Sequence, residues 1–194
     1  MQKLLIFAGP NGSGKSTLTK GIDIFGEYIN ADDIKKFFNC SDKQAADIAE
    51  KTRNWYLENG RDFTFETVLS TVRNIELMKK AKSKGYYIVC MYVLTCDPKI
   101  NIERVKMRFL AGGHNVPEDK IKQRYNRALN LLPELFNICD EVYIFDNSCE
   151  DFNDSSIILK SVNGNIEIYP NKIWSEDMIK SLLCGTYIEE YISN

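Results

Sequence analysis

The sequence lacks three features that would each point to a class of protein: a long apolar run, an excess of positive charge, and a pair of closely spaced cysteines. Its 194 residues contain no run of the ~18–20 apolar residues that a membrane-spanning helix needs. The formal net charge of −2 argues against a protein that coats nucleic acid or binds an anionic membrane surface. We therefore expect neither a nucleic-acid partner nor a membrane partner.

Cysteine is present but scattered, and no two of the six form a Cys-x-x-Cys pair. Isolated cysteines, mostly among apolar residues, favour reduced structural thiols over a disulfide framework or a zinc site. The N-terminal apolar run, residues 4–8, is too short for the core of a secretion signal. Together these features predict a cytoplasmic protein.

What is present is the pattern of an α/β domain. Hydrophobic residues make up 44% of the chain and charged residues 27%, which is ordinary for a globular protein with one core. Short apolar runs alternate with helical patterns, as in a three-layer sandwich around a mainly parallel sheet. About five strands are predicted, at residues 3–8, 27–30, 62–66, 86–94 and 141–145. Helices are predicted at residues 43–58, 71–84, 98–111 and 117–132.

The C-terminal part has a different pattern. Two short apolar runs flank Asn163-Gly164, a strong signal for a hairpin turn. A last helix is predicted over residues 175–190. We therefore divide the chain into a core, residues 1–150, and a small hairpin-and-helix appendage, residues 151–194, that packs on the same domain.

The turn after the first predicted strand carries a complete phosphate-binding motif. Residues 9–16 read Gly-Pro-Asn-Gly-Ser-Gly-Lys-Ser, the Walker A pattern G-x-x-x-x-G-K-[ST], between a buried strand and a helix. Glycines let backbone N–H groups converge on phosphate, the lysine bridges the β- and γ-phosphates, and the serine hydroxyl holds Mg²⁺. The predicted nucleotide contacts are Gly9, Pro10, Asn11, Gly12, Ser13, Gly14, Lys15, Ser16 and Thr17, with Ser16 also the metal ligand.

The motif predicts ATP and Mg²⁺ but not what is done with them. The sequence lacks the Asn-Lys-x-Asp motif by which regulatory GTPases read guanine. It also lacks an apolar strand that ends in Asp-Glu, as in a transport or motor ATPase, since residues 86–94 lead into Thr-Cys-Asp-Pro. A small phosphotransferase with the P-loop NTPase fold remains.

Acidic residues follow two predicted strands, at the sheet edge where α/β proteins bind ligands. Asp32 is the candidate carboxylate that takes the proton of an acceptor hydroxyl, or that lies on the magnesium side. The alternative is that Asp32 and Asp33 only cap a helix that starts at Ile34. Glu66 and Thr67, with Asp33, are candidates for binding the acceptor, and a solvated strand end is the alternative.

Basic residues concentrate in the second half of the core. Between Lys99 and Arg127 lie eight basic and three acidic residues. Two basic helix faces joined by Gly112-Gly113 are typical of a lid, residues 98–132, that closes on phosphate through planar guanidinium groups. The alternative is a solvated charged face. The candidate lid arginines are Arg104, Arg108, Arg124 and Arg127.

His114, the single histidine, lies in the glycine-rich link of this lid. It is a candidate contact to substrate or phosphate, and a hydrogen bond to a loop carbonyl is the equal alternative. Pro117 and the two acids after it then fit the first turn of the next helix.

Taken in order, these motifs resemble the zeta-toxin family of P-loop kinases. The order is GPNGSGKST, then NADD, then FET, then RVxxR with GGHxVP and RYxR. The resemblance covers residues 3–147 and is greatest to short, chromosomally encoded members. It implies a kinase core that uses ATP with Mg²⁺ and phosphorylates a sugar-nucleotide hydroxyl, in studied toxins the 3′-hydroxyl of UDP-N-acetylglucosamine. It also implies an antitoxin protein as a partner.

Carried over residue by residue, the resemblance implies that Lys15 is the family's phosphate lysine and Ser16 its magnesium hydroxyl. The family's catalytic aspartate falls on Asp32, and its substrate-side acid on Glu66. The family's phosphate-binding lid arginines fall among the four candidate arginines, and the resemblance does not identify which two they are. We take Lys15, Asp32, Arg108 and Arg124 as catalytic, and Arg104 and Arg127 as nucleotide-binding. The chain departs from longer toxins in its short C-terminal part and its Gly-Gly-His loop.

Three functions remain in competition. The first is an ATP-dependent small-molecule kinase, toxin-like in its acceptor. The second is a housekeeping or antibiotic-modifying phosphotransferase on the same core. The third is an ATP-binding module without transfer activity, which would have no need of a carboxylate at Asp32.

Overall fold

Strands and helices alternate through most of the chain, and the computed structural model describes residues 1–113, 115–149 and 156–185. The strands are β1 (Lys3–Ala8), β2 (Glu27–Ile29), β3 (Phe63–Thr67), β4 (Tyr87–Leu94), β5 (Glu141–Asp146), β6 (Ser156–Val162) and β7 (Asn165–Ile168). The helices are α1 (Lys15–Leu18), α2 (Ala31–Phe38), α3 (Asp42–Glu58), α4 (Val72–Ser83), α5 (Pro98–Leu110), α6 (Glu118–Ile138) and α7 (Glu176–Cys184). A 3₁₀ turn, Thr19–Gly21, follows α1.

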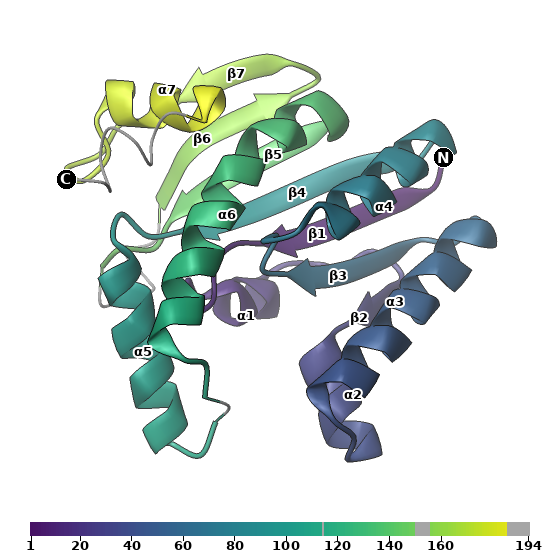
Figure 1. The fold of residues 1–194 in the computed structure, drawn as a ribbon. Coiled ribbons are helices and arrows are strands. Elements are labelled where there is room, and N and C mark those ends of the chain that lie inside the picture. Colours follow the sequence, from purple (N-terminus) through teal and green to yellow (C-terminus); the bar gives the residue numbers. More distant parts are fainter. Residues whose placement is uncertain (114, 150–155, 186–194) are drawn as a thin grey trace.

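These strands form one sheet in the order β2-β3-β1-β4-β5-β6-β7 (Figure 1). The first five in that order are parallel to one another, as strands connected by helices require. β6 then pairs antiparallel with β5, and β7 with β6. The predicted parallel α/β sheet is confirmed. The count of about five strands is too low, because the C-terminal hairpin continues the sheet at its β5 edge.

The hairpin itself forms where the sequence predicts it. Asn163 and Gly164 have φ angles of 49° and 81°, which are the two positive values that a tight hairpin turn of this class needs. Downstream, Trp174 is fully buried, and Ile179 and Leu182 of α7 join the same hydrophobic cluster as the main sheet. The predicted helix 175–190 is present from residue 176 to 184, and its part after residue 185 lies outside the described residues.

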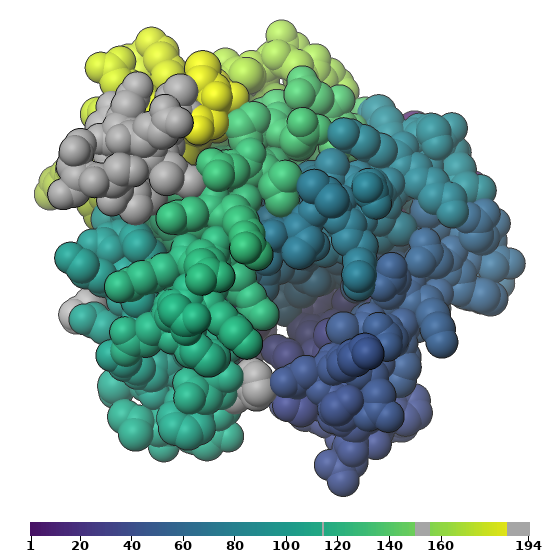
Figure 2. Space-filling view, viewed as in Figure 1, coloured from purple at the N-terminus to yellow at the C-terminus, as the bar shows by residue number. Residues whose placement is uncertain are grey.

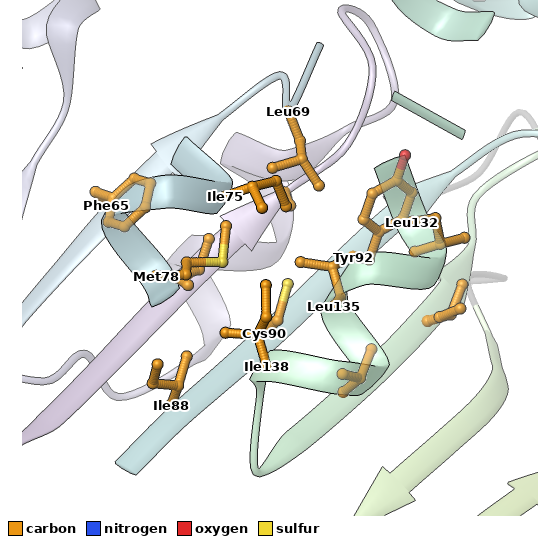
Figure 3. Packing of buried hydrophobic residues seen from close by; sticks show 14 of the residues in the cluster. Phe65, Leu69, Ile75, Met78, Ile88, Cys90, Tyr92, Leu132, Leu135 and Ile138 are labelled. Atoms are coloured by element: carbon orange, nitrogen blue, oxygen red, sulfur yellow. The ribbon is translucent and has the colours of Figure 1, made fainter. Parts of the chain in front are cut away.

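Helices cover the two faces of the sheet unequally. In Figure 1, α3, α4 and α6 lie in front of the sheet, and they pack on β1, β3 and β4 in one large cluster. Figure 3 shows its centre, where Met78 of α4 and Leu135 of α6 lie around Cys90 of β4. The other face holds a smaller cluster around Leu5 and Phe7, covered by α1 and the segment after it.

Helix α6 is longer than predicted because its apolar face continues past Pro133. A proline inside a helix costs about 3 kcal/mol, since it removes an N–H donor and crowds the preceding turn. Leu135 and Ile138 are buried beyond it, and burial of each such side chain contributes about 1.5–3 kcal/mol. The predicted end at residue 132 is therefore wrong, and the helix continues to Ile138.

The predicted lid corresponds to α5, its link and the first half of α6, and we use the term lid for these elements. A small cluster of its own holds the two helices together, made by Ile102, Val105, Val116 and Ile121. Tyr125, one turn further along α6, belongs to the main cluster instead. One long helix, α6, therefore contributes to both the lid and the main core.

Two features of the described residues concern the chain's environment. All six cysteines are free thiols. None of the helices that the structure describes combines the length and the apolar character needed to cross a membrane.

Candidate active site

The phosphate loop follows β1 and turns sharply at its glycines. Gly9 and Gly12 have φ angles of 141° and 79°, which residues with a side chain rarely adopt. A Cβ atom on Gly9 would lie 2.1 Å from the carbonyl oxygen of Val93, and one on Gly12 would lie 2.5 Å from that of Asn101. Only glycine fits these two positions, so the loop lies directly against the end of β4 and the start of α5.

Two asparagines that sequence reasoning missed fix the loop from outside. Asn101 of α5 is fully buried, and its Nδ2 donates to the carbonyl oxygen of Asn11 at 2.7 Å. Asn147, directly after β5, donates from Nδ2 to the carbonyl oxygen of Ser13 at 2.6 Å. The sequence signal for Asn147 is a polar residue just beyond a strand end, which many solvated loops share, and Asn101 is a lone asparagine in the first turns of a helix.

Lys15 begins α1, and its ammonium group turns back into the loop. Its Nζ donates to the carbonyl oxygens of Gly9 at 2.7 Å and of Pro10 at 2.9 Å. Burial lowers the pKa of Lys15 from 10.5 to about 8. The charged groups that also act on this pKa are Glu66, which raises it, Arg108, which lowers it, and Asp32, which raises it.

Glu66 of β3 is the centre of a polar network beside Lys15. The Ser16 hydroxyl donates to its Oε1 at 3.1 Å. The Tyr28 hydroxyl and the Asn30 amide, both from the β2 side, donate to Oε2 at 2.9 Å and 2.6 Å. Burial and the Glu66 carboxylate raise the pKa of Tyr28, so its hydroxyl stays a donor. The structure thus brings Glu66 to the predicted metal ligand Ser16, and it adds Tyr28 and Asn30, which sequence reasoning missed.

Helix α2 begins earlier than expected, and its N-cap is Asn30. The Oδ1 atom of Asn30 accepts a hydrogen bond from the backbone N–H of Asp32 at 2.8 Å. The alternative that Asp32 and Asp33 cap a helix starting at Ile34 is therefore wrong. Both acids lie in the first turn of α2, where the helix dipole favours a carboxylate.

The two aspartates have different neighbours. The carboxylate of Asp32 is exposed and acts electrostatically on Lys15. Asp33 lies 4.0 Å from the Nζ atom of Lys36 on the same helix. Of this pair, Asp32 is the one whose charge acts on Lys15 of the phosphate loop.

Thr67 ends β3 and has the contacts of a residue that forms a turn. Its hydroxyl accepts hydrogen bonds from the backbone N–H of Leu69 at 2.9 Å and from Nδ2 of Asn74 at 2.6 Å. Its carbonyl oxygen accepts a hydrogen bond from the N–H of Gly9 at 3.2 Å. These contacts tie the phosphate loop to the start of α4.

Two of the four candidate arginines lie on the phosphate loop side of the lid. Arg124 of α6 reaches the loop, with Nη1 3.3 Å from Oδ1 of Asn11. Arg108 of α5 is close enough to Lys15 to lower the pKa of that lysine. Arg127, which shares a helix face with Arg124 in the sequence pattern, is exposed.

Arg104 has a different role in the structure from the one that the sequence suggested. Its Nη1 donates to the carbonyl oxygen of Asn147 at 2.7 Å, and its Nη2 donates to that of Cys149. Burial lowers the pKa of Arg104. The guanidinium therefore fixes the segment after β5, which in turn holds the phosphate loop through Asn147.

Figure 2 shows a hollow between the green surface of α6 and the blue surface of α2 and α3, with purple atoms of the N-terminal region at its floor. The predicted contact at His114 lies outside the described residues.

The loop fits the phosphates that its motif predicts. The Oγ atom of Ser13 is buried and has no hydrogen-bond partner among the described residues. An unpaired buried hydroxyl needs an explanation, and a phosphate oxygen in the glycine cradle supplies one. Ser16 and Glu66 add two oxygen groups 3.1 Å apart, which are the hard ligands that Mg²⁺ prefers.

Sequence comparison agrees with this geometry. The protein-family model for Zeta toxin matches residues 2–172. An uncharacterized protein from Haemophilus influenzae is 33% identical over 129 residues, which are 63% of this chain and 92% of that protein.

Two solved structures share the fold at low identity. A chain in the complex of AvrRxo1-ORF1 and AvrRxo1-ORF2 with ATP superposes with a TM-score of 0.70 at 10% identity, over 94% of this chain. This chain spans only 64% of that one. A chain of the PezAT chromosomal toxin–antitoxin system of Streptococcus pneumoniae has a TM-score of 0.56 at 17% identity, over 100% of this chain and 88% of that one.

Proposed function

The chain belongs to the zeta-toxin family and is a phosphotransferase, and on that premise we propose that it transfers the γ-phosphate of ATP to a hydroxyl of a small molecule. The acceptor that we propose is a sugar nucleotide such as UDP-N-acetylglucosamine, in keeping with the family resemblance. An antitoxin protein is the proposed partner, and the toxin–antitoxin system to which the pneumococcal neighbour belongs supports it.

One observation carries the proposal: charges from three separate elements converge on Lys15. Glu66 comes from β3, Asp32 from α2 and Arg108 from α5, and each acts on the pKa of that lysine. A binding module needs the lysine and the loop, but it has no need of an exposed carboxylate beside them. A lysine, a metal-side acid, a second acid and a lid arginine are the parts of a phosphoryl-transfer site.

The proposed reaction divides the work among these groups. Lys15 and the loop N–H groups hold the β- and γ-phosphates. Asp32 orients the acceptor hydroxyl and accepts its proton as the acceptor oxygen bonds to the γ-phosphorus and the bridge to the β-phosphate breaks. Arg108 and Arg124 close on the transferred group and stabilise the negative charge that shifts toward the leaving oxygen.

Magnesium fits between the phosphate loop and β3. Ser16 and Glu66 would hold the ion, which when bound neutralises charge on the β- and γ-phosphates. Tyr28 and Asn30 keep the Glu66 carboxylate turned toward Ser16 through their hydrogen bonds to Oε2. This assignment moves Glu66 from the acceptor side to the metal side of the site.

A transfer screen tests the proposal directly. The purified full chain is incubated with γ-labelled ATP and Mg²⁺ against a panel of sugar nucleotides and small alcohols. We expect labelled product with at least one acceptor, and none with Lys15→Ala, whose circular dichroism spectrum should match the parent. Tight ATP binding without label transfer to any acceptor would favour the binding module. Growth arrest on induced expression, lost in Lys15→Ala, would separate a toxin from a housekeeping kinase.

A further inference from the structure

A second polar cavity lies outside the phosphate-loop site, between α3 and α4. Its volume is about 180 Å³. Arg53 and Asn54 of α3 line it on one side, and Arg73 and Asn74 of α4 on the other. The cavity adjoins the end of β3, because Asn74 donates to the Thr67 hydroxyl at 2.6 Å.

Arg53 is the unusual residue of this cavity. Its side chain is buried, with 9% of the residue exposed, and its guanidinium lies over the Phe65 ring at 5.1 Å from the centroid. Its Nε atom has no hydrogen-bond partner in the part of the chain that the structure describes. Burial lowers the pKa of Arg53 because the charged form loses hydration. A buried N–H donor without a partner costs stability unless a ligand supplies one.

The acids near Arg53 serve other cations as well: the Glu50 carboxylate raises the pKa of Arg53 but also pairs with Arg73. Glu50 lies 3.0 Å from Nη1 of Arg73 in an ion pair at the rim of the cavity. Lys80, another lining residue, pairs with Glu58 at 2.5 Å. Glu76 also lines the cavity but is exposed. Arg53 is the buried positive charge among the residues that line the cavity, and the acids lie at its rim.

The amide groups of the cavity define the rest of the ligand. The Nδ2 atom of Asn54 donates to the carbonyl oxygen of Glu50 at 3.1 Å, and that of Asn74 donates to Thr67. Each Nδ2 atom thus uses one of its two N–H donors in these bonds, and each Oδ1 atom is left as an acceptor among the described residues. A ligand that suits the cavity carries one anionic group for Arg53 and hydroxyl or amine donors for the two amides.

We propose that the cavity between α3 and α4 is an anion-binding site, in which Arg53 holds a phosphate or carboxylate group of a hydroxyl-bearing small molecule. The group comes either from the far end of the phosphate acceptor or from a separate effector. Both sources present the same chemistry to Arg53. The site goes beyond the proposed kinase function, and binding to it can be measured without any transfer reaction.

Nuclear magnetic resonance of the ¹⁵N-labelled full chain tests the site residue by residue. Inorganic phosphate is titrated at constant ionic strength while the Arg53 Nε–H and Asn74 side-chain signals are followed. We expect a saturable shift of both signals, distinct from the shift of the Gly12 and Gly14 amides at the phosphate loop. Absence of a saturable shift at Arg53 would overturn the proposal.

Two variants provide the controls. Arg53→Met keeps the length of the side chain and removes the charge, and it should abolish the shift at Asn74. Arg61→Gln removes an exposed arginine that stacks on Trp55 at 5.6 Å just beyond α3, and it should leave the shift unchanged. Persistence of the Asn74 shift in Arg53→Met would also overturn the proposal.

Stability distinguishes a ligand-binding arginine from a structural one. If Arg53 is kept for a ligand, Arg53→Met should melt at the same or a higher temperature than the parent without phosphate. Phosphate should then raise the melting temperature of the Lys15→Ala variant, in which the loop is weakened, but not that of the Lys15→Ala, Arg53→Met double variant. A large drop in melting temperature for Arg53→Met with no phosphate effect would mean a structural role.

A competition experiment identifies the source of the anion. UDP-N-acetylglucosamine, which carries a diphosphate, is added to the phosphate-saturated chain. Displacement of phosphate at Arg53 supports the acceptor as the source. An unchanged Arg53 signal, with the loop-side signals shifted, supports a separate effector. The resonance shifts and the melting temperatures can be measured even if the transfer screen finds no product. The anion-site proposal and the kinase proposal can therefore fail independently.

Discussion

Two regions of the candidate site are built in different ways. One is the lid, and the other is the floor, which consists of Lys15, Ser16, Tyr28, Asn30 and Glu66. On the floor, Glu66 accepts hydrogen bonds from three side chains, and Lys15 is held by two loop carbonyls. On the lid, Arg108 and Arg127 are exposed, and Arg124 makes one long contact to the loop. The floor is held by short contacts between strands, whereas the lid charges take their positions from two helices with a small cluster of their own.

In the proposed reaction, this difference divides phosphate binding and the chemical step between the two regions. A network that is already hydrogen-bonded needs no rearrangement when charge shifts during transfer, so it stabilises the transition state efficiently. The lid guanidinium groups have no such network with the phosphate loop, where Arg124 makes one contact at 3.3 Å. We therefore expect changes on the floor to affect the chemical step, and changes on the lid to affect both phosphate affinity and the chemical step.

The largest effect is expected at Asp32, an exposed residue of α2 whose charge acts on Lys15 of the floor. Asp32→Asn keeps the shape of the side chain and removes the proton acceptor, so transfer should fall by roughly 10²–10⁴-fold. ATP affinity and melting temperature should stay unchanged, because Asn30 and not Asp32 caps α2. Calorimetric titration with ATP and Mg²⁺ beside a transfer assay measures both quantities.

The outcome for Asp32 also separates its alternatives. Loss of ATP affinity along with transfer, only when Mg²⁺ is present, would assign Asp32 to the metal. Normal transfer in Asp32→Asn would remove it from the mechanism and leave Asp33 or Glu66 as the base.

The lid offers a matched pair of arginines on one helix. Arg124→Glu should lower transfer by about 10²–10³-fold, because its guanidinium faces the phosphate loop at Asn11. Arg127→Glu adds the same charge change at an exposed position and should cost far less. Arg127→Glu should leave the melting temperature within a few degrees of the parent, since exposed charges contribute under ~1 kcal/mol. Equal losses in the two variants would mean that the lid acts through its total charge alone.

The regular parts of this fold could be predicted because each has a local cause. The Gly9–Ser16 motif, the apolar strands and Asn163-Gly164 are short segments whose residues alone favour one conformation. The contacts that complete the site have no such local cause. Asn101 and Asn147 meet the phosphate loop from residues about 90 and 134 positions away, and nothing in their neighbours distinguishes them from solvated asparagines.

The end of α6 and the role of Arg104 were predicted wrongly for the same reason: contacts between distant parts of the chain override the local signal. Pro133 stops a helix on local grounds, and the buried Leu135 and Ile138 override it. Arg104 and Arg108 share a predicted helix face, yet one binds backbone carbonyls and the other acts on Lys15. Side-chain type and spacing locate the lid, but only the packed structure tells which of its arginines is already engaged.

A smaller effect is expected at Asn30, which links the two halves of the floor. Its Nδ2 donates to Glu66, and its Oδ1 caps α2 ahead of Asp32. Asn30→Ala should remove both contacts, lowering transfer by about 10–100-fold, as for other residues that orient a ligand-binding group. It should also lower the stability by about 1 kcal/mol through the lost cap.

The conservative change at Asn30 separates these two contacts. Asn30→Asp keeps a good cap but replaces the donor to Glu66 by a second carboxylate. Stability should recover toward that of the parent as the cap returns, while transfer stays low. Recovery of both would mean that the asparagine acts on the helix alone.

The smallest expected effect is on the pH dependence of ATP affinity, which distinguishes the lysine of the floor from the arginines of the lid. Burial lowers the pKa of Lys15 from 10.5 to about 8 in the free protein, whereas guanidinium groups stay charged throughout this range. ATP affinity should therefore decrease above pH 8, by at most about tenfold per pH unit, as the lysine must take up a proton to bind phosphate. Lys15→Met should bind weakly and lack this dependence, and a calorimetric titration series from pH 7 to 10 measures it.

The free energy of unfolding of the ATP-free protein should change with pH in the opposite direction to the ATP affinity. Between pH 8 and 10.5 the unfolded chain holds a proton on Lys15 that the folded chain has released, so the free energy of unfolding rises with pH from this group. Below pH 8 the cost of the buried ammonium is fully present. The free energy of unfolding of the parent, measured with urea, should therefore gain on that of Lys15→Met as the pH rises from 8 to 10.5. A difference that stays constant over this range would show that Lys15 titrates at its ordinary pKa, and that the loop carbonyls and Glu66 fully offset its burial.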